Sequence, residues 1–466
     1  MVNGPWLDDP VRDGTTPGRI VILLENLPVE RDRRVWRQAR ALVRHGLAVT
    51  VVCPASEEWA SGSGGRGSRR RTVDGVEIRS FVPARERSGV LGFVLEYLVA
   101  LAKMTWILRR LHRSSRIGGI QVCNPPDIFF AVGWWARRRG IPFLFDQHDL
   151  CPELFLTRFG AGPAPGADRR VPAPLVAVIL AVLRRCERET YLSASRVIAT
   201  NDSYRRVAIE RGGVGPRDVV VVRNGPDPER MRPNGSVSRS GGDRRLVVWM
   251  GNIGPQDGVD DAVRAVAHLV RRIGRTDTDF VFIGRGEARA AAMAVAEQLD
   301  LDRYVTFTGW IPDDEAFALL SAADVGLSAD PPGPLNNCST MNKTLEYMAF
   351  GLPVVAHDLH ETRISAGPAA VYAADGTPEA LARCLDRLLD DPDRMASMGR
   401  EGRRRIEARL GWPHQAAGYV ALWQSVLGLD PKPVGSPAST APVLSPVVAT
   451  AGQRAENSTM SPNART

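Results

Sequence analysis

The feature that most constrains the fold is an alternation of short β-branched runs with longer amphipathic stretches, which continues along most of the chain. In the first half these runs lie at 20–24, 49–53, 76–81, 120–123, 143–146, 196–200 and 219–222. In the second half they lie at 246–250, 280–283, 305–307, 325–327, 353–356 and 370–372, between helical stretches such as 259–273 and 287–299. This alternation is typical of parallel sheets covered by helices, so the sequence predicts an α/β fold.

The 466 residues are too many for one compact core and favour two or three domains. A Ser/Gly/Arg-rich segment at 234–243 has no apolar periodicity and predicts a linker. The chain then divides into a first domain at 19–233 and a second domain at 244–411. Both are expected to be Rossmann-like, doubly wound parallel-sheet domains that face each other across a cleft, where α/β folds place their ligands.

The two ends of the chain differ in composition from its middle. Residues 1–18 carry Asp8, Asp9 and Asp13 and no apolar run, which predicts a flexible N-terminus and no signal peptide. A last helix at 412–428 is expected to pack back on the first domain. The segment 430–466 is rich in Pro, Ser, Thr and Ala and is expected to be disordered.

Composition excludes several classes of protein. The six cysteines form no Cys-x-x-Cys and have no His at metal-ligand spacing, so neither a metal site nor a disulfide framework is expected, and a reducing cytoplasm fits. The apolar stretches at 90–108 and 171–183 are interrupted and too short to span a bilayer. The net charge of +8 favours anionic partners. No nucleic-acid partner is expected, because the arginines are scattered over helices without a reading motif.

The segment 329–355 reads as a loop that leads into a helix and then a buried strand. Pro331, Pro332, Gly333 and Pro334 predict irregular structure at its start. Ser339 or Thr340 can then cap a helix whose first amides have no internal partner, and such a helix start binds anions readily.

Two charged residues follow on this helix. Lys343 lies in the first turn, where the helix dipole disfavours a cation, so an anionic ligand such as phosphate is expected beside it. Glu346 lies three residues further on, where a carboxylate can accept hydrogen bonds from a sugar diol. The alternative is a plain helix cap with a solvated Lys343 that forms a surface pair with Glu346.

Polar residues follow three further strands. The loop after the first strand lacks Gly-x-Gly-x-x-Gly, which argues against a dinucleotide-binding dehydrogenase, and its Arg33 and Arg34 could clamp an anionic acceptor or lie on the surface. His148 and Asp149 follow the strand at 143–146, where they are either site residues or structural. Arg285, in Gly284-Arg285-Gly286, could reach a phosphate, although this short motif is weak evidence alone.

Several motifs together carry a family resemblance. They read Asp32-Arg33-Arg34-Val35-Trp36, Asp146-Gln147-His148-Asp149, Asn224-Gly225-Pro226-Asp227, Gly254-Pro255-Gln256-Asp257-Gly258 and Ser339-Thr340-Met341-Asn342-Lys343. In their order and spacing, from about Arg19 to Leu427, the chain resembles the bacterial group 1 glycosyltransferases, which are retaining enzymes of the GT-B fold. The motifs are most similar to a branch associated with surface-polysaccharide assembly.

The resemblance implies that the domain at 19–233 lies on the acceptor side and that the domain at 244–411 binds the nucleotide sugar. It also implies a set of site residues. His148 is expected to face the donor sugar and to act with Lys343 and Glu346 in catalysis, while Arg33 and Asp149 lie on the acceptor or phosphate side. The segment Gly309-Trp310-Ile311 is expected beside the nucleotide base. The remaining residues expected to bind the donor are Asn252, Gly254, Arg285, Asp330, Ser339, Thr340, Met341 and Asn342.

The sequence also departs from the family pattern. Cys338 stands where the first Glu of the family's Glu-x7-Glu signature is expected, and Asp330 or amides near Asn337 could substitute for it. Asn252 and Asp257 replace the Arg and Lys that many members use on the diphosphate. Neutralising the diphosphate would then fall to Lys343 and Arg285.

The implied function is transfer of a sugar from a nucleotide-diphosphate sugar donor to a hydroxyl of a glycan or polyprenyl-linked saccharide acceptor, in exopolysaccharide or cell-surface polysaccharide biosynthesis. No cofactor and no metal is expected. The location is expected to be cytoplasmic, and the helix at 90–113 could rest on an anionic membrane surface or simply pack on the first sheet. The alternatives are a sugar-nucleotide epimerase or phosphorylase of the same fold, or a non-catalytic nucleotide-sugar-binding protein.

Overall fold

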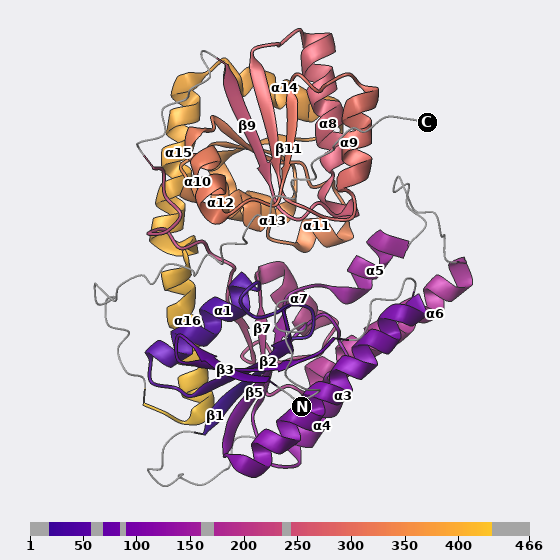
Figure 1. Ribbon diagram of the computed structural model, residues 1–466, viewed down its shortest axis with the longest axis vertical. Coiled ribbons are helices and arrows are strands. Elements are labelled where there is room, and N and C mark those ends of the chain that lie inside the picture. Colours follow the sequence, from indigo (N-terminus) through magenta and orange to yellow (C-terminus); the bar gives the residue numbers. More distant parts are fainter. Residues whose placement is uncertain (1–17, 57–68, 84–89, 160–171, 235–243, 431–466) are drawn as a thin grey trace, which may run out of the picture. The chain divides into compact units, whose positions relative to one another are not determined.

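A computed structural model describes residues 18–56, 69–83, 90–159, 172–234 and 244–430. Apart from single residues at their edges, the predicted flexible N-terminus, the linker at 234–243 and the tail at 430–466 lie outside these ranges. The described residues form two β-sheets with helices packed on both faces (Figure 1). The α/β fold class with two parallel-sheet domains is therefore confirmed.

The first sheet has the strand order β3-β4-β2-β1-β5-β6-β7-β8. Its parallel strands are β1 (Arg19–Leu23), β2 (Val49–Pro54), β4 (Val76–Phe81), β5 (Ile117–Cys123), β6 (Phe143–Gln147), β7 (Arg196–Ala199) and β8 (Val219–Val221). Each coincides, within three residues at either end, with a β-branched run. Such runs suit a parallel sheet because both of its faces are buried.

One strand of this sheet was not predicted. β3 (Arg69–Val73) pairs antiparallel with β4 at the edge of the otherwise parallel sheet. Its sequence, Arg-Arg-Arg-Thr-Val, is polar because an edge strand meets solvent, and it has no apolar run. The missed signal is the turn Asp74-Gly75, where both residues have positive φ, as a tight hairpin requires.

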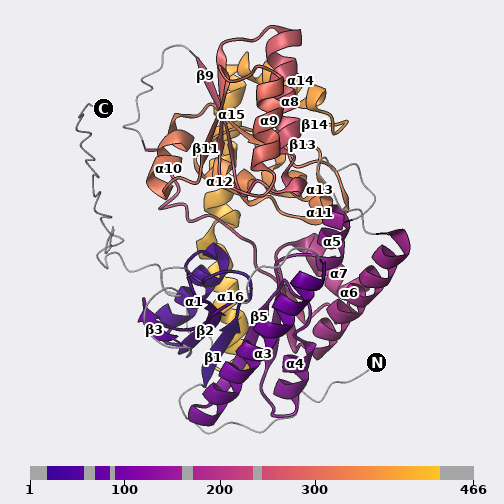
Figure 2. The ribbon, with the colours of Figure 1, turned by 45° about the vertical axis from the view of Figure 1, so that its right-hand side comes forward.

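Alternate side chains of β1 enter different cores. Ile20 and Ile22 pack with α1 (Arg33–Arg44) and α16 (Trp412–Leu427). Val21 and Leu23 pack with the helices of the other face, α3 (Val90–Ser114), α4 (Phe130–Arg137), α6 (Ala173–Ser193) and α7 (Asp202–Glu210) (Figure 2). α16 therefore returns from the end of the described chain to the first sheet, where Trp423 is fully buried.

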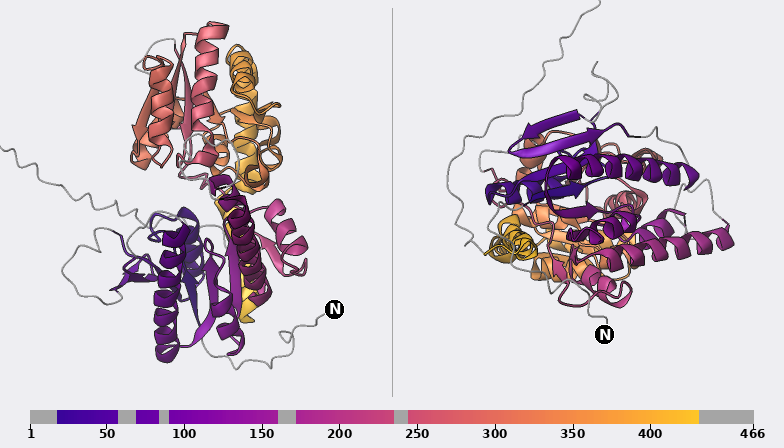
Figure 3. Two further views of the ribbon diagram at one scale, coloured as in Figure 1. Left: turned by 90° about the vertical axis from the view of Figure 1, so that its right-hand side faces the viewer. Right: turned by 90° about the horizontal axis from the view of Figure 1, so that it is seen from below.

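The second sheet is parallel throughout, with the order β11-β10-β9-β12-β13-β14. Its strands are β9 (Arg245–Met250), β10 (Thr278–Ile283), β11 (Val305–Gly309), β12 (Val325–Ser328), β13 (Val354–His357) and β14 (Ala370–Ala373). Helices lie on both sides of these strands (Figure 3). The sheet matches the six predicted runs within two residues at each end.

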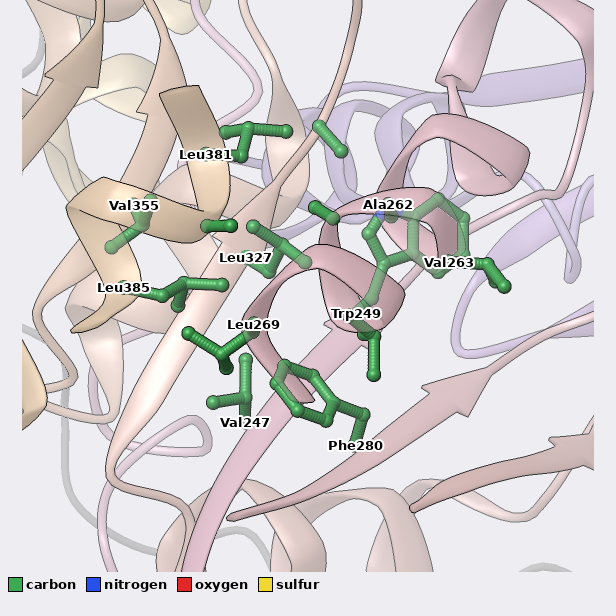
Figure 4. Packing of buried hydrophobic residues seen from close by; sticks show 14 of the residues in the cluster. Val247, Trp249, Ala262, Val263, Leu269, Phe280, Leu327, Val355, Leu381 and Leu385 are labelled. Carbon is green, nitrogen blue, oxygen red and sulfur yellow. The ribbon is translucent and has the colours of Figure 1, made fainter. Parts of the chain in front are cut away.

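Again the two faces build separate cores. Val247 and Trp249 pack with α8 (Val259–His268), α9 (Arg289–Gln298) and α14 (Pro378–Leu389) (Figure 4). Val248, between them, packs with α10 (Asp313–Ala322) and α12 (Asn342–Ala349). α15 (Pro392–Arg405) adds Met395 and Met398 to the first of these cores.

The strand orders define where ligands can bind. In the first sheet the chain runs from β1 outward through β2, and β5 then lies on the other side of β1. In the second sheet it runs from β9 through β10 to β11, and β12 then lies on the other side of β9. Each reversal is a topological switch point, and open α/β sheets bind ligands outside the carboxyl ends of the strands at such points.

Candidate active site

Lys343 is the centre of the polar cluster at the switch point of the second sheet. As the second residue of α12, it donates to Asp330 Oδ1 at 2.6 Å and to Asp257 Oδ1 at 3.1 Å. Asp330 follows β12 and Asp257 follows β9, so the two strands that define the switch point supply the two carboxylates. The Nζ atom also lies 4.8 Å from the centre of the Trp249 ring.

Burial makes this cluster electrostatically important. Lys343 is only 7% exposed and Asp330 only 1%. Burial lowers the pKa of Lys343, but the attraction of Asp330 and Asp257 outweighs burial, so its pKa lies above the ordinary value and the ammonium persists. The alternative of a solvated Lys343 paired with Glu346 is therefore wrong. One ammonium and two carboxylates leave the cluster with a net charge of about −1.

The predicted cap of α12 is also wrong. Met341 is the N-cap residue and makes no side-chain cap bond. The Ser339 hydroxyl donates to Leu335 O at 2.8 Å and contacts Tyr204 OH, and Thr340 Oγ1 accepts from Asn201 at 3.0 Å. A short helix, α11 (Pro334–Cys338), replaces the irregular structure expected after the prolines, because proline fits the first helical position.

Asn201 and three other residues missed by sequence analysis hold the segment before α12. Asn201 Nδ2 donates to Cys338 O at 2.8 Å. Buried Glu361, on α13 (His360–Ala366), accepts from Ser203 Oγ at 2.6 Å and lies 3.4 Å from Arg223. Asn201 follows β7 just as His148 follows β6, so its position at a strand end was the available signal.

Glu346 binds a cation in this structure. Its Oε1 accepts from Arg33 at 3.1 Å, and Arg33 also contacts Asp313 at 2.7 Å. Burial raises the pKa of Glu346, while Arg33 opposes this shift. Arg33 is half-exposed and binds carboxylates, whereas Arg34 is buried against Asp146. The prediction that Arg34 could clamp an anion is therefore wrong, and Arg33 remains a candidate.

The loops after β9, β10 and β11 carry the other predicted donor residues. Gly284 and Gly286 lie in the positive-φ region, and a Cβ atom on them would lie 1.8 Å from Gly251 O and 2.2 Å from Ile253 O. These glycines therefore allow the loops after β9 and β10 to touch. This close approach accounts for the Gly-x-Gly motif, and no bound phosphate is needed to explain it. Asn252 is exposed, and Gly254 donates its amide to Asp257 at 3.1 Å.

Arg285 and Trp310 are both exposed at this edge. The Arg285 guanidinium lies 5.3 Å from the centre of the Trp310 ring, and Trp310 is 64% exposed. Gly309 supplies a positive φ before it, and the partly buried Ile311 packs on the core behind it. Of the remaining predicted residues, Met341 is buried and Asn342 is exposed at the start of α12.

His148 lies at the carboxyl edge of the first sheet, directly after β6. Its Nε2 atom is 3.1 Å from Asp146 Oδ2, and its amide donates to Asn124 Oδ1 at 2.6 Å. Burial lowers the pKa of His148, but Asp146 outweighs burial and raises it well above its ordinary value. The imidazole therefore keeps its proton to a higher pH than an ordinary histidine. Asn124 also accepts from the Asp149 amide, and burial raises the pKa of the Asp149 carboxyl.

Cys123, Asp146 and His148 place a thiol, a carboxylate and an imidazole within 4.8 Å of one another. Asp146 is already occupied, since it accepts two hydrogen bonds from Arg34 and one each from Gln38 and Gln121. A guanidinium at 2.6 Å repels a metal ion, so this cluster does not fit one. It instead fixes the position of His148.

Both halves of the chain match models of known families. Residues 32–225 match a glycosyl transferase 4-like domain, and residues 244–391 match the glycosyl transferases group 1. The chain is 30% identical over 308 residues to a 2-deoxystreptamine glucosyltransferase of Streptomyces kanamyceticus, a match that spans 63% of this chain and 73% of that protein. It is 27% identical to a D-inositol 3-phosphate glycosyltransferase of Thermobispora bispora, over 64% and 68% of the two chains.

Solved structures share the fold. Sucrose-phosphate synthase from Thermosynechococcus elongatus superimposes with a TM-score of 0.69 at 16% identity, covering 88% of this chain and 99% of that one. WaaG, a glycosyltransferase involved in lipopolysaccharide biosynthesis, superimposes with a TM-score of 0.61 at 16% identity, covering 88% of this chain and 100% of that one. Two parallel sheets with polar clusters at their switch points thus define an enzyme of the GT-B type. The chain belongs to the group 1 glycosyltransferases.

Proposed function

We propose that this glycosyltransferase moves a sugar from a nucleoside-diphosphate sugar to a hydroxyl group, with retention of the anomeric configuration and without a metal. The observation that carries the proposal is the position of Lys343, which lies at the start of α12 and at the switch point of the second sheet. A helix start with no side-chain cap offers its first amides to an anion, and the ammonium adds a full charge.

A diphosphate would have to compete with the carboxylates that surround Lys343. Asp257 is the more exposed of the two, with 16% of its side chain accessible compared with 2% for Asp330. Burial raises the pKa of Asp257, so this carboxyl group takes up a proton more readily than usual when an anion approaches. Lys343 would then exchange Asp257 for the diphosphate and keep Asp330, whose second oxygen is held by Ser328.

The exposed pair of Arg285 and Trp310 suits the nucleoside. An aromatic ring beside a guanidinium offers a flat surface for a base and a charge for a phosphate. Glu346 would accept hydrogen bonds from the ribose diol once it releases Arg33.

The chemical step requires stabilisation of the departing diphosphate. Negative charge grows on this group as the bond to the sugar breaks, and Lys343 with the α12 amides would stabilise it in a site largely shielded from water. His148 would lie by the donor sugar and orient its hydroxyl groups, while Arg33 and Asp149 would serve the acceptor. Residues that stabilise the leaving group should affect kcat more than KM.

For the acceptor we propose a glycan or polyprenyl-linked saccharide in cell-surface or exopolysaccharide biosynthesis, handled in the cytoplasm at the inner face of the membrane. None of the helices in the described ranges is long and apolar enough to cross a bilayer. A second candidate acceptor is a small polyhydroxylated ring, since two relatives carry names that refer to 2-deoxystreptamine and inositol 3-phosphate.

The test is release of nucleoside diphosphate, followed by mass spectrometry, from a panel of UDP-, GDP- and dTDP-sugars with both kinds of acceptor. We expect acceptor-dependent turnover that falls by about 10²-fold or more in Lys343→Ala and falls in His148→Ala. Lys103→Ala, at a half-buried lysine on α3 that bonds the Val82 carbonyl away from the candidate site, should keep full turnover. Donor binding without turnover across the panel would favour a binding protein. Release without an acceptor product would favour the epimerase or phosphorylase alternative.

A further inference from the structure

A second polar site lies at the opposite edge of the first sheet. The last turn of α3 leads into β5 and the last turn of α4 leads towards β6, so the ends of both helices lie at the amino edge of the sheet (Figure 1). His148 and Asn124 lie at the carboxyl edge of the same strands. A ligand at the ends of α3 and α4 is therefore separate from the proposed donor and acceptor.

The helix ends border an open cavity of about 240 Å³. Among the described residues, the cavity is lined by three arginines, one histidine and one tryptophan. These are Arg109, His112 and Arg113 of α3, and Trp135 and Arg139 at the end of α4. His112 meets the Trp135 ring edge-on at 5.3 Å, and the Arg139 guanidinium lies 4.6 Å from the same ring. A water molecule occupies about 30 Å³ in the liquid, so the cavity has room for a phosphate group.

The arginines of this cavity have no acidic partner in the described part of the chain. In the described ranges, no carboxylate oxygen lies within 4.0 Å of a guanidinium nitrogen of Arg109, Arg113 or Arg139, which is the distance limit for an ion pair. Arg275, by contrast, contacts three aspartates. Three exposed guanidinium groups around one open cavity attract an anion.

The surface around the cavity is apolar. Leu95, Leu98 and Trp106 of α3 are 42%, 53% and 47% exposed, and Trp134 of α4 is 42% exposed. On α3 these residues share one face with Arg109 and Arg113, because their spacing follows the 3.6-residue period. The opposite face, with Met104, Leu108 and Leu111, packs on the sheet. An exposed face that is apolar along the helix and basic at its end is typical of a helix that lies on a membrane.

We propose that the cavity binds the phosphate of an anionic phospholipid headgroup and that α3 and α4 dock on the bilayer around it. Arginine matches a phosphodiester through paired hydrogen bonds, and Trp106 and Trp134 suit the headgroup level of a membrane. The Arg110 guanidinium, 4.0 Å from the Trp106 ring, adds a further positive charge there. The inference rests on the proposed function in that docking would bring the enzyme to a lipid-linked acceptor, but headgroup binding requires neither donor nor acceptor.

The experiment compares sedimentation of the full chain with phosphatidylcholine vesicles and with vesicles that also contain about 30 mol% phosphatidylglycerol. The test variant is Arg109→Gln/Arg113→Gln, and the matched control is Arg394→Gln/Arg400→Gln on α15, two exposed arginines of the second domain. We expect binding only to the anionic vesicles and a loss of about 25-fold in the test variant, a factor of about 5 for each arginine. The control should stay within about twofold of the parent.

Two further arms separate the possible outcomes. Calorimetry with inorganic phosphate measures whether the cavity takes a free ion; binding of phosphate without vesicle binding would overturn the lipid assignment. An equal loss in the test and control variants would also overturn it, since net charge alone would then explain adsorption. Turnover on a soluble acceptor should be unchanged in both variants, which shows that they fold. If no turnover is found in any form, vesicle binding still tests the headgroup site alone.

Discussion

At the level of single residues, the charge around Lys343 distinguishes this site from a plain anion site. Asp257 stands at a position where many relatives are expected to carry a cation, and it contacts the one ammonium of the cluster at 3.1 Å. A diphosphate and Asp257 therefore compete for Lys343. This competition should weaken donor binding and make it depend on pH.

We expect Asp257→Asn to bind the donor about tenfold more tightly than the parent near pH 8, because the variant removes one like charge from the anion site. Burial raises the pKa of Asp257, so at lower pH the parent should also lose this negative charge by protonation. The affinities of the parent and of Asp257→Asn for the donor should then become more similar. Calorimetric titration of the parent and of Asp257→Asn with the nucleoside diphosphate, at both pH values, measures these affinities. Asp300→Asn, at an exposed position with positive φ that asparagine tolerates, is the control. Weaker binding in Asp257→Asn would show that Asp257 orients Lys343 instead.

Glu25 follows β1 and is only 6% exposed, and burial, assisted by Glu96, raises its pKa from 4.5 to about 7. As the pH rises from about 4.5, the unfolded chain releases this proton before the folded protein does, so folding stability is lost between about pH 4.5 and 7.

Glu25→Gln should therefore be more stable than the parent near pH 8, by up to about 3 kcal/mol, and nearly equal to it near pH 4.5. Urea unfolding at the two pH values checks this expectation. Glu210→Gln, at an exposed position on α7, should show no comparable gain. An equal effect of Glu25→Gln at both pH values would contradict the assignment.

At the level of elements, glycines set how closely the loops of the second sheet approach. The loop after β10 touches the loop after β9, with Ile253 donating its amide to Arg285 O at 2.9 Å. Gly284 has a φ of 141° and no space for a side chain. The position of Arg285 therefore depends on a glycine that need not touch the ligand.

Gly284→Ala should lower the free energy of unfolding by about 2–4 kcal/mol, since a methyl group would overlap the Gly251 carbonyl oxygen and the backbone would be strained. Gly418→Ala is the matched change in the middle of α16, where nothing lies within 4 Å of the added carbon. This control should instead stabilise by about 0.5–1 kcal/mol. Thermal unfolding of both variants tests the pair, and similar losses would refute the steric argument.

At the level of the whole molecule, one buried network joins distant parts of the chain. Asp146 of β6 binds Arg34 and Gln38 of α1 and Gln121 of β5, and Gln121 Oε1 accepts from Tyr419 of α16 at 2.7 Å. Burial raises the pKa of Asp146, but Arg34 and His148 outweigh burial and lower it below 3.8. Its contribution to stability is therefore present above about pH 3.8 and is lost as the pH falls below that value.

Asp146→Asn should cost about 3–5 kcal/mol near pH 7, because it leaves the Arg34 guanidinium buried without a counter-charge. Tyr419→Phe removes one hydrogen bond of the same network and should cost about 1–2 kcal/mol. Tyr304→Phe, on a half-buried residue of the second domain, is the control and should be nearly neutral. Chemical unfolding provides the measurement, and a neutral Asp146→Asn would show that the network does not stabilise the fold.

The sequence by itself determined the parallel strands, the class of fold and the family. Strands of a parallel sheet are buried on both faces, so their composition is local information: the runs that became β1 and β9 can be recognised without knowing their neighbours. The same holds for motifs such as Ser339 to Lys343, whose spacing along the chain is itself the signal. The polar edge strand β3 had no such local mark.

Only the tertiary structure decided which charged groups meet. Lys343 binds Asp257, which is 86 residues away along the chain, and Arg34 binds Asp146, 112 residues away. Asn201 donates a hydrogen bond to Thr340, 139 residues away. Each pairing depends on the strand order, which sets the loops that lie together at a switch point, and on burial, which excludes the water that would otherwise solvate these charges. Strand order and burial are properties of the packed sheets, so the residues alone could predict that Lys343 needs an anion but not that two carboxylates already bind it.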